Sequence, residues 1–281
     1  MELKELAESV IKRLNFHFQS DYAAIQVKGL DEPEYCNERA LYQDRYEGND
    51  VWTIGRCRRR GADNIPRHLE EFTMVECARR WKGAGRVGPT VASALEEVLR
   101  LYSLLAGLER KDLEILKYDF NECAEKGRDE SRSVEVGDPV CFRGEKLDII
   151  PEVKQEEGDY LLRLDSALSC FDLIPGGPHR LLVLENMPAH PYAPTESRTG
   201  KRCEVYNFRR NEKMPMEIAN IYEHNLDSDD LKCRGVEIPV VWPERSIDYG
   251  MGLERCLLAA EVAEDISEFS GLCELAESTC Q

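Results

Sequence analysis

Two β-rich runs separated by a polar loop give the clearest indication of architecture in this chain. Residues 51–57 (VWTIGRC) and 72–77 (FTMVEC) are rich in β-branched and aromatic residues. The loop between them contains Gly61, Asp63 and Pro66, residues that favour turns. This pattern predicts an antiparallel hairpin with a long tip.

The spacing of apolar residues predicts a mixed α+β domain around this hairpin. Helices are expected at 2–15 and 90–106, the second with Thr90 as its cap and Gly107 as its stop. Further short strands are expected at 22–27, 160–164, 180–185, 203–208, 216–221 and 246–251, and a final helix from Leu253. Few helices separate the strands of the second half, which favours an antiparallel sheet flanked by helices. We expect one domain over residues 1–281, with the charged stretch 121–159 as a peripheral insertion.

A glycine motif in the first half resembles a dinucleotide site but is explained more simply. Gly83, Gly85 and Gly88 spell G-x-G-x-x-G between a predicted strand and a predicted helix. The helix leads into the charged 121–159 stretch and not into a second parallel strand with an acidic ribose ligand. Pro89 is typical of a helix-entry turn, so no dinucleotide site is predicted.

Composition restricts the class of protein. At 281 residues and 42% hydrophobic content, the chain can bury a substantial core. It has no run of about 18 apolar residues, and its first residues mix charges into a helical pattern, so we expect a soluble cytoplasmic protein with no membrane partner. The 11 cysteines include no CxxC pair and the 5 histidines no HExxH, which argues against a zinc site and a disulfide framework.

Charge restricts the partners. The formal net charge of −17 disfavours DNA and free tRNA, because basic residues supply most non-specific affinity for nucleic acids. Within residues 56–86, however, basic side chains are concentrated: Arg56, Arg58, Arg59, Arg60, Arg67, Arg79, Arg80, Lys82 and Arg86. This cluster indicates either a binding site for a small polyphosphate or a solvated basic face.

The hairpin segment 55-GRCRRRGADNIPRHLEEFTMVE-76 resembles motif 2 of class II aminoacyl-tRNA synthetases, in which two strands and their loop hold ATP. The resemblance implies that Arg59 holds the α-phosphate, that Arg67 and His68 contact the outer phosphates, and that Phe72 stacks on adenine. A guanidinium suits the first role because it binds phosphate and carboxylate oxygens bidentately and neutralises charge as pyrophosphate leaves.

The segment 248-DYGMGLERCLLA-259 resembles motif 3 of the same class, a glycine-containing strand that runs into a helix. Gly250 and Gly252 would let a nucleotide lie against bare backbone, and Arg255 would sit over adenine or reach the γ-phosphate. Motif 1, which forms the dimer in this class, would be compressed into residues 2–30.

Other segments resemble the lysyl-tRNA synthetase subgroup and its truncated relative, the ligase that attaches β-lysine to elongation factor P. They are 32-EPEYCNERAL-41, 186-NMPAHPYAPTE-196, 202-RCEVYNF-208 and 216-MEIANIYEHNLD-227. The resemblance implies that Glu34 and Glu76 face the amino groups of the substrate and that Asn220 lines its pocket.

The same resemblance implies a site for Mg²⁺ or the substrate ammonium at Glu204, Glu217 and Glu223. Each of these glutamates taken alone is typical of a solvated surface charge, and only their placement in the motifs indicates a site. Two departures affect the expected chemistry. Gly61 replaces a motif 2 glutamate, and Ala78 replaces an aromatic residue beside the lysine pocket, which predicts extra room there.

Together these features lead us to expect an AMP-forming ligase that makes an aminoacyl-adenylate from ATP and lysine or a lysine-like amino acid. Arg59, Arg255 and Mg²⁺ would position the reactants and stabilise charge. The acceptor would be a protein, carrier or small molecule, because no anticodon-binding domain is expected beside the core, and the family favours a homodimer.

The sequence is compatible with two alternatives. The chain could be the catalytic subunit of a lysyl- or pyrrolysyl-type synthetase whose tRNA-binding parts lie elsewhere, and the run HLEEFTMV suits the pyrrolysine group. It could instead be an inactive paralogue that binds ATP or an amino acid to regulate a partner, a hypothesis favoured by Gly61.

Overall fold

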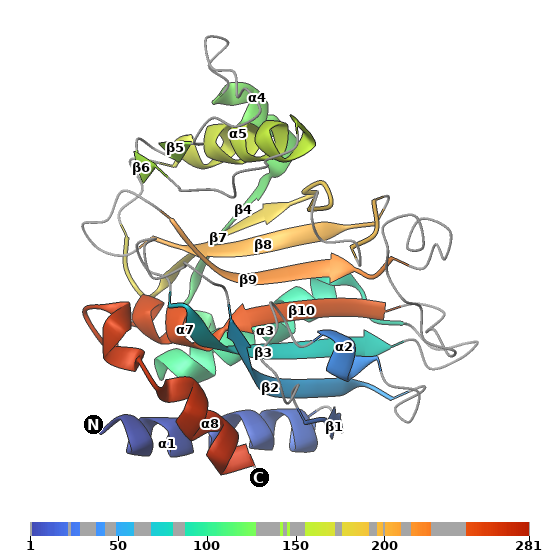
Figure 1. Cartoon of the computed structure of the whole chain (residues 1–281). Coiled ribbons are helices and arrows are strands. Elements are labelled where there is room, and N and C mark those ends of the chain that lie inside the picture. The colour runs from blue at the N-terminus through green and yellow to red at the C-terminus, as the bar shows by residue number, and fades with distance from the viewer. Residues whose placement is uncertain are drawn as a thin grey trace.

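One eight-stranded sheet forms the centre of the molecule (Figure 1). The structure is a computed structural model that describes residues 2–21, 24–28, 38–42, 49–58, 69–80, 88–127, 141–142, 145–146, 155–171, 176–190, 196–198, 200–208, 215–225 and 246–280. The strands of the sheet are β1 (Ile25–Gln26), β2 (Val51–Arg58), β3 (Glu71–Arg80), β4 (Glu114–Asp119), β7 (Arg180–Glu185), β8 (Arg202–Asn207), β9 (Met216–Glu223) and β10 (Ser246–Gly252). Their order is β1-β2-β3-β10-β9-β8-β7-β4.

Strand direction confirms the predicted α+β class and adds one feature. From β2 to β7 every neighbouring pair is antiparallel, as the sequence predicts. The edge strands β1 and β4 instead run parallel to β2 and β7. Because β3 is antiparallel to both of its neighbours, β3 is not the first strand of a parallel βαβ unit, and the dinucleotide interpretation is excluded.

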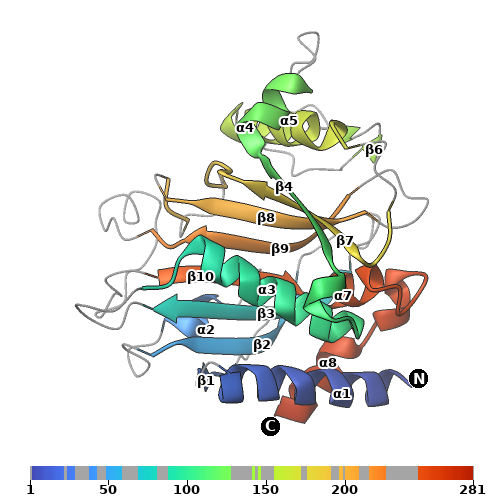
Figure 2. The ribbon, with the colours of Figure 1, turned by 180° about the vertical axis from the view of Figure 1, so that it is seen from behind.

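Helices cover both faces of the sheet. They are α1 (Leu3–Phe16) with its π-helical extension η1 (His17–Asp21), α2 (Glu38–Leu41), α3 (Val91–Ala106), η4 (Arg110–Asp112), α4 (Phe120–Lys126), α5 (Gln155–Ser169), α7 (Leu253–Ala259), η5 (Ile266–Phe269) and α8 (Leu272–Cys280); a small ribbon pairs β5 (Cys141–Phe142) with β6 (Glu145–Lys146). Figure 2 shows α3 across one face, which we call the helix face, with α1 and α8 near the β1–β2 end. The opposite face carries α2 (Figure 1).

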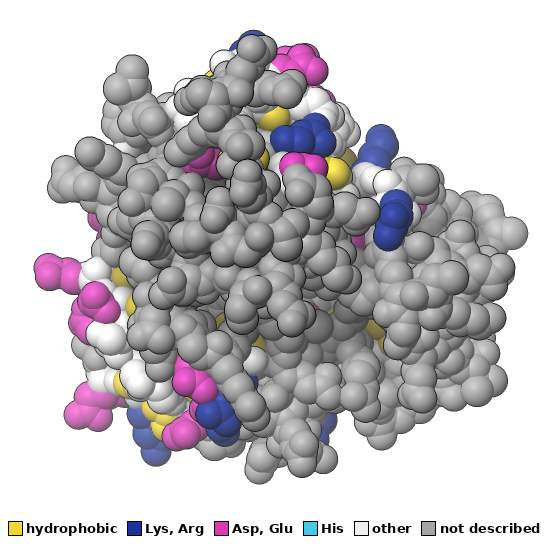
Figure 3. Space-filling view, turned by 45° about the horizontal axis from the view of Figure 1, so that its top comes forward, with side chains coloured by type: hydrophobic (Ala, Val, Ile, Leu, Met, Phe, Trp, Pro, Cys, Tyr) yellow, Lys and Arg dark blue, Asp and Glu magenta, His cyan; other side chains and the backbone are white. Residues whose placement is uncertain are grey.

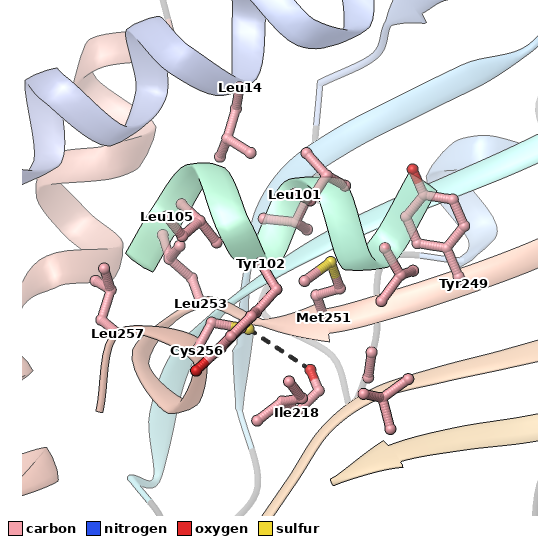
Figure 4. Packing of buried hydrophobic residues seen from close by; sticks show 14 of the residues in the cluster. Leu14, Leu101, Tyr102, Leu105, Ile218, Tyr249, Met251, Leu253, Cys256 and Leu257 are labelled. Carbon is pink, nitrogen blue, oxygen red and sulfur yellow. Dashed lines mark hydrogen bonds between the residues drawn. The ribbon is translucent and has the colours of Figure 1, made fainter. Parts of the chain in front are cut away.

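The main core lies between the helix face and α1, α3, α7 and α8. Figure 4 shows its centre, where leucines of three helices meet apolar residues of the sheet: Leu14, Leu101, Leu105, Leu253, Leu257, Ile218 and Met251. Burying such a side chain stabilises the fold by about 1.5–3 kcal/mol. The thiol of Cys256 also donates to the carbonyl of Ile218 at 3.7 Å. This packing fixes α7, and therefore its surface residue Arg255, against the sheet.

Helix α3 is confirmed with both of its predicted ends. The Oγ1 of Thr90 accepts a hydrogen bond from the Ser93 amide at 3.1 Å, and the Oγ of Ser93 accepts one from the Thr90 amide at 2.9 Å. Gly107 ends the helix with φ 66°, in the left-handed region that favours glycine. These contacts are local, which explains why sequence alone located them.

Three expectations about elements are corrected. The predicted strand at 160–164 is wrong, because these residues belong to α5, whose apolar positions Tyr160, Leu164 and Leu168 follow a helical period. Within the described part of the predicted strand at 22–27, Ile25 and Gln26 form the strand β1. The strand β4, with α4 after it, was not predicted, since its half-exposed, charged sequence is typical of a sheet edge.

Among the residues that the structure describes, no helix is both long enough and apolar enough to cross a membrane.

Candidate active site

A row of aligned residues crosses the face of the sheet opposite α3, which we call the site face. Glu76 of β3 pairs with Gly250 of β10, Gly250 with Asn220 of β9, and Asn220 with Glu204 of β8. Directly opposed residues on antiparallel strands project to the same side, so this site row brings Glu76, Asn220 and Glu204 onto one surface about 14 Å long. The structure therefore brings together one predicted glycine and three predicted polar residues.

Gly250 leaves the middle of the site row without a side chain. A methyl group at this position would lie 2.8 Å from the Cε of Met74 and 3.6 Å from the Cγ of Glu76. Glycine thus leaves bare backbone between two polar side chains, the condition that the motif 3 resemblance requires for close approach of a ligand.

Arg255 lies over the end of the same strand. A methyl group on Gly252 would contact the aliphatic part of the Arg255 side chain at 3.7–3.9 Å. The guanidinium reaches β9, where NH1 donates to the carbonyl of Glu217 at 3.3 Å and lies 3.8 Å from its carboxylate. Gly252 and Arg255, predicted from one segment, and Glu217, predicted from another, are therefore neighbours.

The start of α7 is held to β3 by Glu254, a residue to which sequence reasoning assigned no role. Its carboxylate is buried and accepts from the amide of Thr73 at 2.9 Å and from the Oγ1 of Thr73 at 2.7 Å. Burial raises the pKa of this carboxyl to about 7, although the Thr73 hydrogen bonds oppose the shift. Glu254 thus anchors the turn from which Arg255 projects.

Strand β3 presents two predicted ligand contacts on the site face. Phe72, Met74 and Glu76 alternate with Thr73 and Val75, which turn toward the helix face. Phe72 is half-buried, whereas Glu76 is only 7% exposed. The two lie about 13 Å apart along the strand, so an aromatic face and a buried carboxylate mark the two ends of this part of the site.

At the β8 end of the site row, Arg202 is the centre of a buried polar network. Its Nε donates to the Oδ1 of Asn220 at 3.1 Å and lies 3.2 Å from the carboxylate of Glu196. Its NH1 donates to the hydroxyl of Tyr160 and to the carbonyl of Pro188, both at 2.8 Å. Its NH2 donates to Glu204. Sequence reasoning missed Arg202, although it lies within a segment that resembles the family.

Glu204 is enclosed by this network. Its carboxylate is 3% exposed and accepts hydrogen bonds from Arg202 and from the hydroxyl of Tyr206. Burial raises the pKa of this carboxyl to about 7, even though Arg202 opposes the shift. Glu204 is therefore already engaged by protein groups.

Comparison with known proteins adds a structural likeness. No family model and no curated sequence matches the chain. Among solved structures, asparaginyl-tRNA synthetase from Pyrococcus horikoshii superimposes with TM-score 0.62 at 14% identity, over 96% of this chain and 66% of that one. The enzyme from Entamoeba histolytica in complex with asparaginyl-adenylate gives 0.60 at 12% identity, over 95% of this chain and 65% of that one.

A putative aspartyl-tRNA synthetase from Leishmania major Friedlin gives TM-score 0.55 at 13% identity, over 98% of this chain and 64% of that one. The fold is that of the class II aminoacyl-tRNA synthetase core. The chain spans just under two thirds of the length of these three proteins. They are asparaginyl and aspartyl enzymes, so the lysyl subgroup indicated by the sequence stays a prediction.

The predicted metal residues differ in their exposure and in their contacts. Glu217 lies opposite Tyr206 on the site face, with a side chain that is 41% exposed, and Glu223 accepts from the Lys201 amide at 3.3 Å. Among the described residues, no group of three or more His, Cys, Asp or Glu side chains forms a metal-binding cluster. Mg²⁺ needs only one or two carboxylates when phosphates and waters complete its shell. Glu217 fits that requirement better than the enclosed Glu204.

Several predicted residues lie outside the described part of the chain. These are Arg59, Arg67 and His68 of the motif 2 loop and Glu34 of the EPEY segment, together with Gly61 and Asp63. Their assignments stay predictions.

The basic cluster is divided between structural contacts and these undescribed segments. Arg56 pairs with Glu71 at 2.9 Å, Arg58 with Glu70 at 2.8 Å, and Arg79 with Asp50 at 3.2 Å. Arg80 donates to the carbonyl of Leu41. The described members of the cluster thus hold the hairpin and α2 in place, and none of them is placed on a phosphate site.

The extra room predicted at Ala78 is not found at that residue. Ala78 is fully buried and packs in a small cluster with Leu41 and Tyr42. The hydroxyl of Tyr42 donates to Asp248 and to the Oγ of Ser246 at 3.1 Å. Residues of α2 and Tyr42 thus pack beside Ala78 on the site face.

Proposed function

We propose that this chain activates an amino acid by adenylation. The amino acid's carboxylate oxygen attacks the α-phosphorus of ATP, a new carboxyl–phosphate bond forms, and the bond to the β-phosphate oxygen breaks so that pyrophosphate leaves. The observation that carries the proposal is the site row of Glu76, Gly250, Asn220 and Glu204, with Arg255 beside it, on the site face of a class II fold.

The described groups suit positioning and charge stabilisation, which are the main requirements of phosphoryl-group chemistry. The half-buried ring of Phe72 offers a stacking face for adenine. The backbone at Gly250 carries no side chain, which lets the nucleotide approach the sheet. Arg255 supplies a positive charge next to these groups, 19% exposed at its side chain. Mg²⁺, held in part by Glu217, would neutralise phosphate oxygens when bound. No protein nucleophile is required.

For the substrate, we propose lysine or a lysine-like amino acid. Glu76 is a nearly buried carboxylate at one end of the site row, and the family resemblance places a contact with the substrate ammonium at this residue. Arg202, the cation at the other end, is engaged by Glu204, Glu196 and Asn220. The balance of charge on the site face therefore favours a cationic side chain over an anionic one.

For the acceptor, we propose a protein, carrier or small molecule in preference to free tRNA. The support is the formal net charge of −17, which opposes long-range attraction of a polyanion. The homodimer implied by family resemblance is part of the same proposal.

Amino-acid-dependent exchange of pyrophosphate into ATP tests the chemistry and the substrate together. The panel consists of lysine, β-lysine, ornithine, pyrrolysine analogues and the standard amino acids, with asparagine and aspartate included, each with Mg²⁺. We expect exchange with at least one, and its loss in Arg255→Ala but not in Arg110→Ala, whose guanidinium pairs with Glu96 away from the site. Silence of the folded wild-type protein across the panel would contradict the proposal and favour an inactive regulatory paralogue.

A further inference from the structure

The helix pair α4–α5 packs onto the site face itself, although α4 and the start of α5 lie within or next to the stretch 121–159 that the sequence analysis treats as a peripheral insertion. Its apolar residues share a cluster with the site-face side chains of β7 and β8: Phe120, Tyr160, Leu168, Leu182, Leu184 and Tyr206. Figure 1 shows the pair beyond β7 and β4, at the end of the sheet where the site row terminates.

One side chain of α5 reaches from this apolar cluster into the polar network. Tyr160 is 5% exposed, and its hydroxyl accepts from the NH1 of Arg202 at 2.8 Å and lies 3.4 Å from the Oε1 of Glu204. Its ring lies 4.9 Å from that of His190, with 56° between the planes. The hydroxyl is thus a buried acceptor aimed at a buried cation, which makes its hydrogen bond one of the stronger kind.

Arg202 connects Tyr160 to the site row. Its Nε donates to the Oδ1 of Asn220, and the Nδ2 of Asn220 donates to the Oε1 of Glu196 at 3.0 Å. Because the oxygen of the carboxamide faces a donor and its nitrogen faces an acceptor, only one orientation of Asn220 satisfies both contacts. Asn220 is therefore set by groups whose own positions depend on Arg202.

We propose that Tyr160 is a positioning residue for the amino-acid pocket, acting through Arg202 on Asn220, so that the α4–α5 pair is part of the site. This inference rests on the proposed amino-acid activation. Without the hydroxyl, the Arg202 NH1 retains only the Pro188 carbonyl among these two acceptors. The guanidinium can then turn toward Glu204 and Glu196, and the carboxamide of Asn220 loses its fixed orientation.

The test is Tyr160→Phe, compared with Tyr118→Phe. Phenylalanine keeps the ring that packs in the cluster, so the fold is expected to survive, which thermal unfolding verifies. Tyr118 belongs to β4 and packs against Phe171, but it is 42% exposed and takes no part in the Arg202 network described above. We expect Tyr160→Phe to raise the KM for the activated amino acid about five- to tenfold, the equivalent of one hydrogen bond, with the KM for ATP unchanged. Tyr118→Phe should leave both constants at their wild-type values.

A double-mutant cycle separates positioning from general loosening. If Tyr160 acts through Asn220, adding Tyr160→Phe to Asn220→Ala should raise the amino-acid KM little beyond that of Asn220→Ala alone. Additive effects, an equal rise in the KM for ATP, or a wild-type amino-acid KM in Tyr160→Phe would overturn the inference and leave adenylation standing. Silence of the wild-type protein with every amino acid would overturn both.

Discussion

Arg255 and Phe72 are the two described side chains best placed to contact a nucleotide. Arg255 lies over Gly252, and Phe72 is half-buried on the same face of the neighbouring strand β3. We expect Arg255→Ala and Phe72→Ala each to weaken ATP binding by about 1–3 kcal/mol, through loss of a cation and of a stacking face respectively. Calorimetric titration with ATP measures this change.

Matched controls for these variants lie elsewhere on the molecule. Phe16 of α1 is 68% exposed, so Phe16→Ala removes the same ring without touching the site face. Arg110→Ala removes a guanidinium whose partner is Glu96. Wild-type ATP affinity in both site variants would remove the motif 2 and motif 3 assignments.

Glu76 tests the selectivity of the site. If this buried carboxylate faces the substrate ammonium, Glu76→Gln leaves the ammonium unpaired, which costs a few kcal/mol. We expect a large rise in the amino acid's KM, or no activation, with nearly unchanged ATP affinity. The same outcome is predicted for Glu34→Gln. Wild-type kinetics with the same amino acid in both variants would exclude the lysine-like pocket.

The joint between α7 and β3 is the element on which the placement of Arg255 depends. Thr73 and Glu254 are separated by 181 positions in sequence, yet they share three hydrogen bonds in the buried interface between strand and helix. The apolar side of α7 packs into the core through Leu253, Cys256 and Leu257 (Figure 4). The helix is therefore fixed at its first turn and along its length.

This joint makes stability depend on pH. Burial raises the pKa of Glu254 from 4.5 to about 7, so between these values the folded state holds a proton that the unfolded state has lost. The contribution of this group to stability is full below about pH 4.5 and is lost as pH rises to about 7, at most about 3 kcal/mol. We expect Glu254→Gln to flatten this part of the pH dependence, measured by urea unfolding. The exposed Glu274→Gln serves as the control, and identical curves for wild type and Glu254→Gln would contradict the prediction.

The charge of the whole molecule disfavours the binding of polyanions. The segment 260–276 exposes several acidic side chains and contains no Lys or Arg: Glu261, Glu264, Asp265, Glu268 and Glu274. Figure 3 shows described Asp and Glu side chains gathered along one side of the molecule. Together with the net charge of −17, this surface creates a negative electrostatic potential that repels nucleic acids.

We therefore expect tRNA to bind weakly and to lose affinity steeply between about 50 and 200 mM salt, because nearly all of its affinity would come from electrostatic contacts with phosphates. Titration of labelled tRNA at several salt concentrations measures both quantities. Glu261→Lys with Glu264→Lys should strengthen this non-specific binding. A tight, salt-tolerant complex with one tRNA species would contradict the prediction and favour a synthetase subunit.

Elements whose signals are local are predictable from the sequence. Helix α3 was located with both ends because Thr90, Ser93 and Gly107 act on their own neighbours. The hairpin and the strands β7 to β10 were predicted because alternating apolar residues and turn residues lie next to each other in the chain. The placement of Phe72 and Glu76 on one strand, and of Gly250 and Gly252 just before Arg255, followed from the same local order.

Features that depend on partners distant in sequence become visible in the folded structure alone. Tyr160 looked like part of a strand because a short apolar run fits either period, and its helix is settled by packing against β7 and β8. The contact between Tyr160 and Arg202 joins residues 42 positions apart, and the parallel pairing of β4 with β7 likewise crosses a long connection. Neither has a signature in neighbouring residues, because burial and charge pairing between remote segments exist only once the chain has folded.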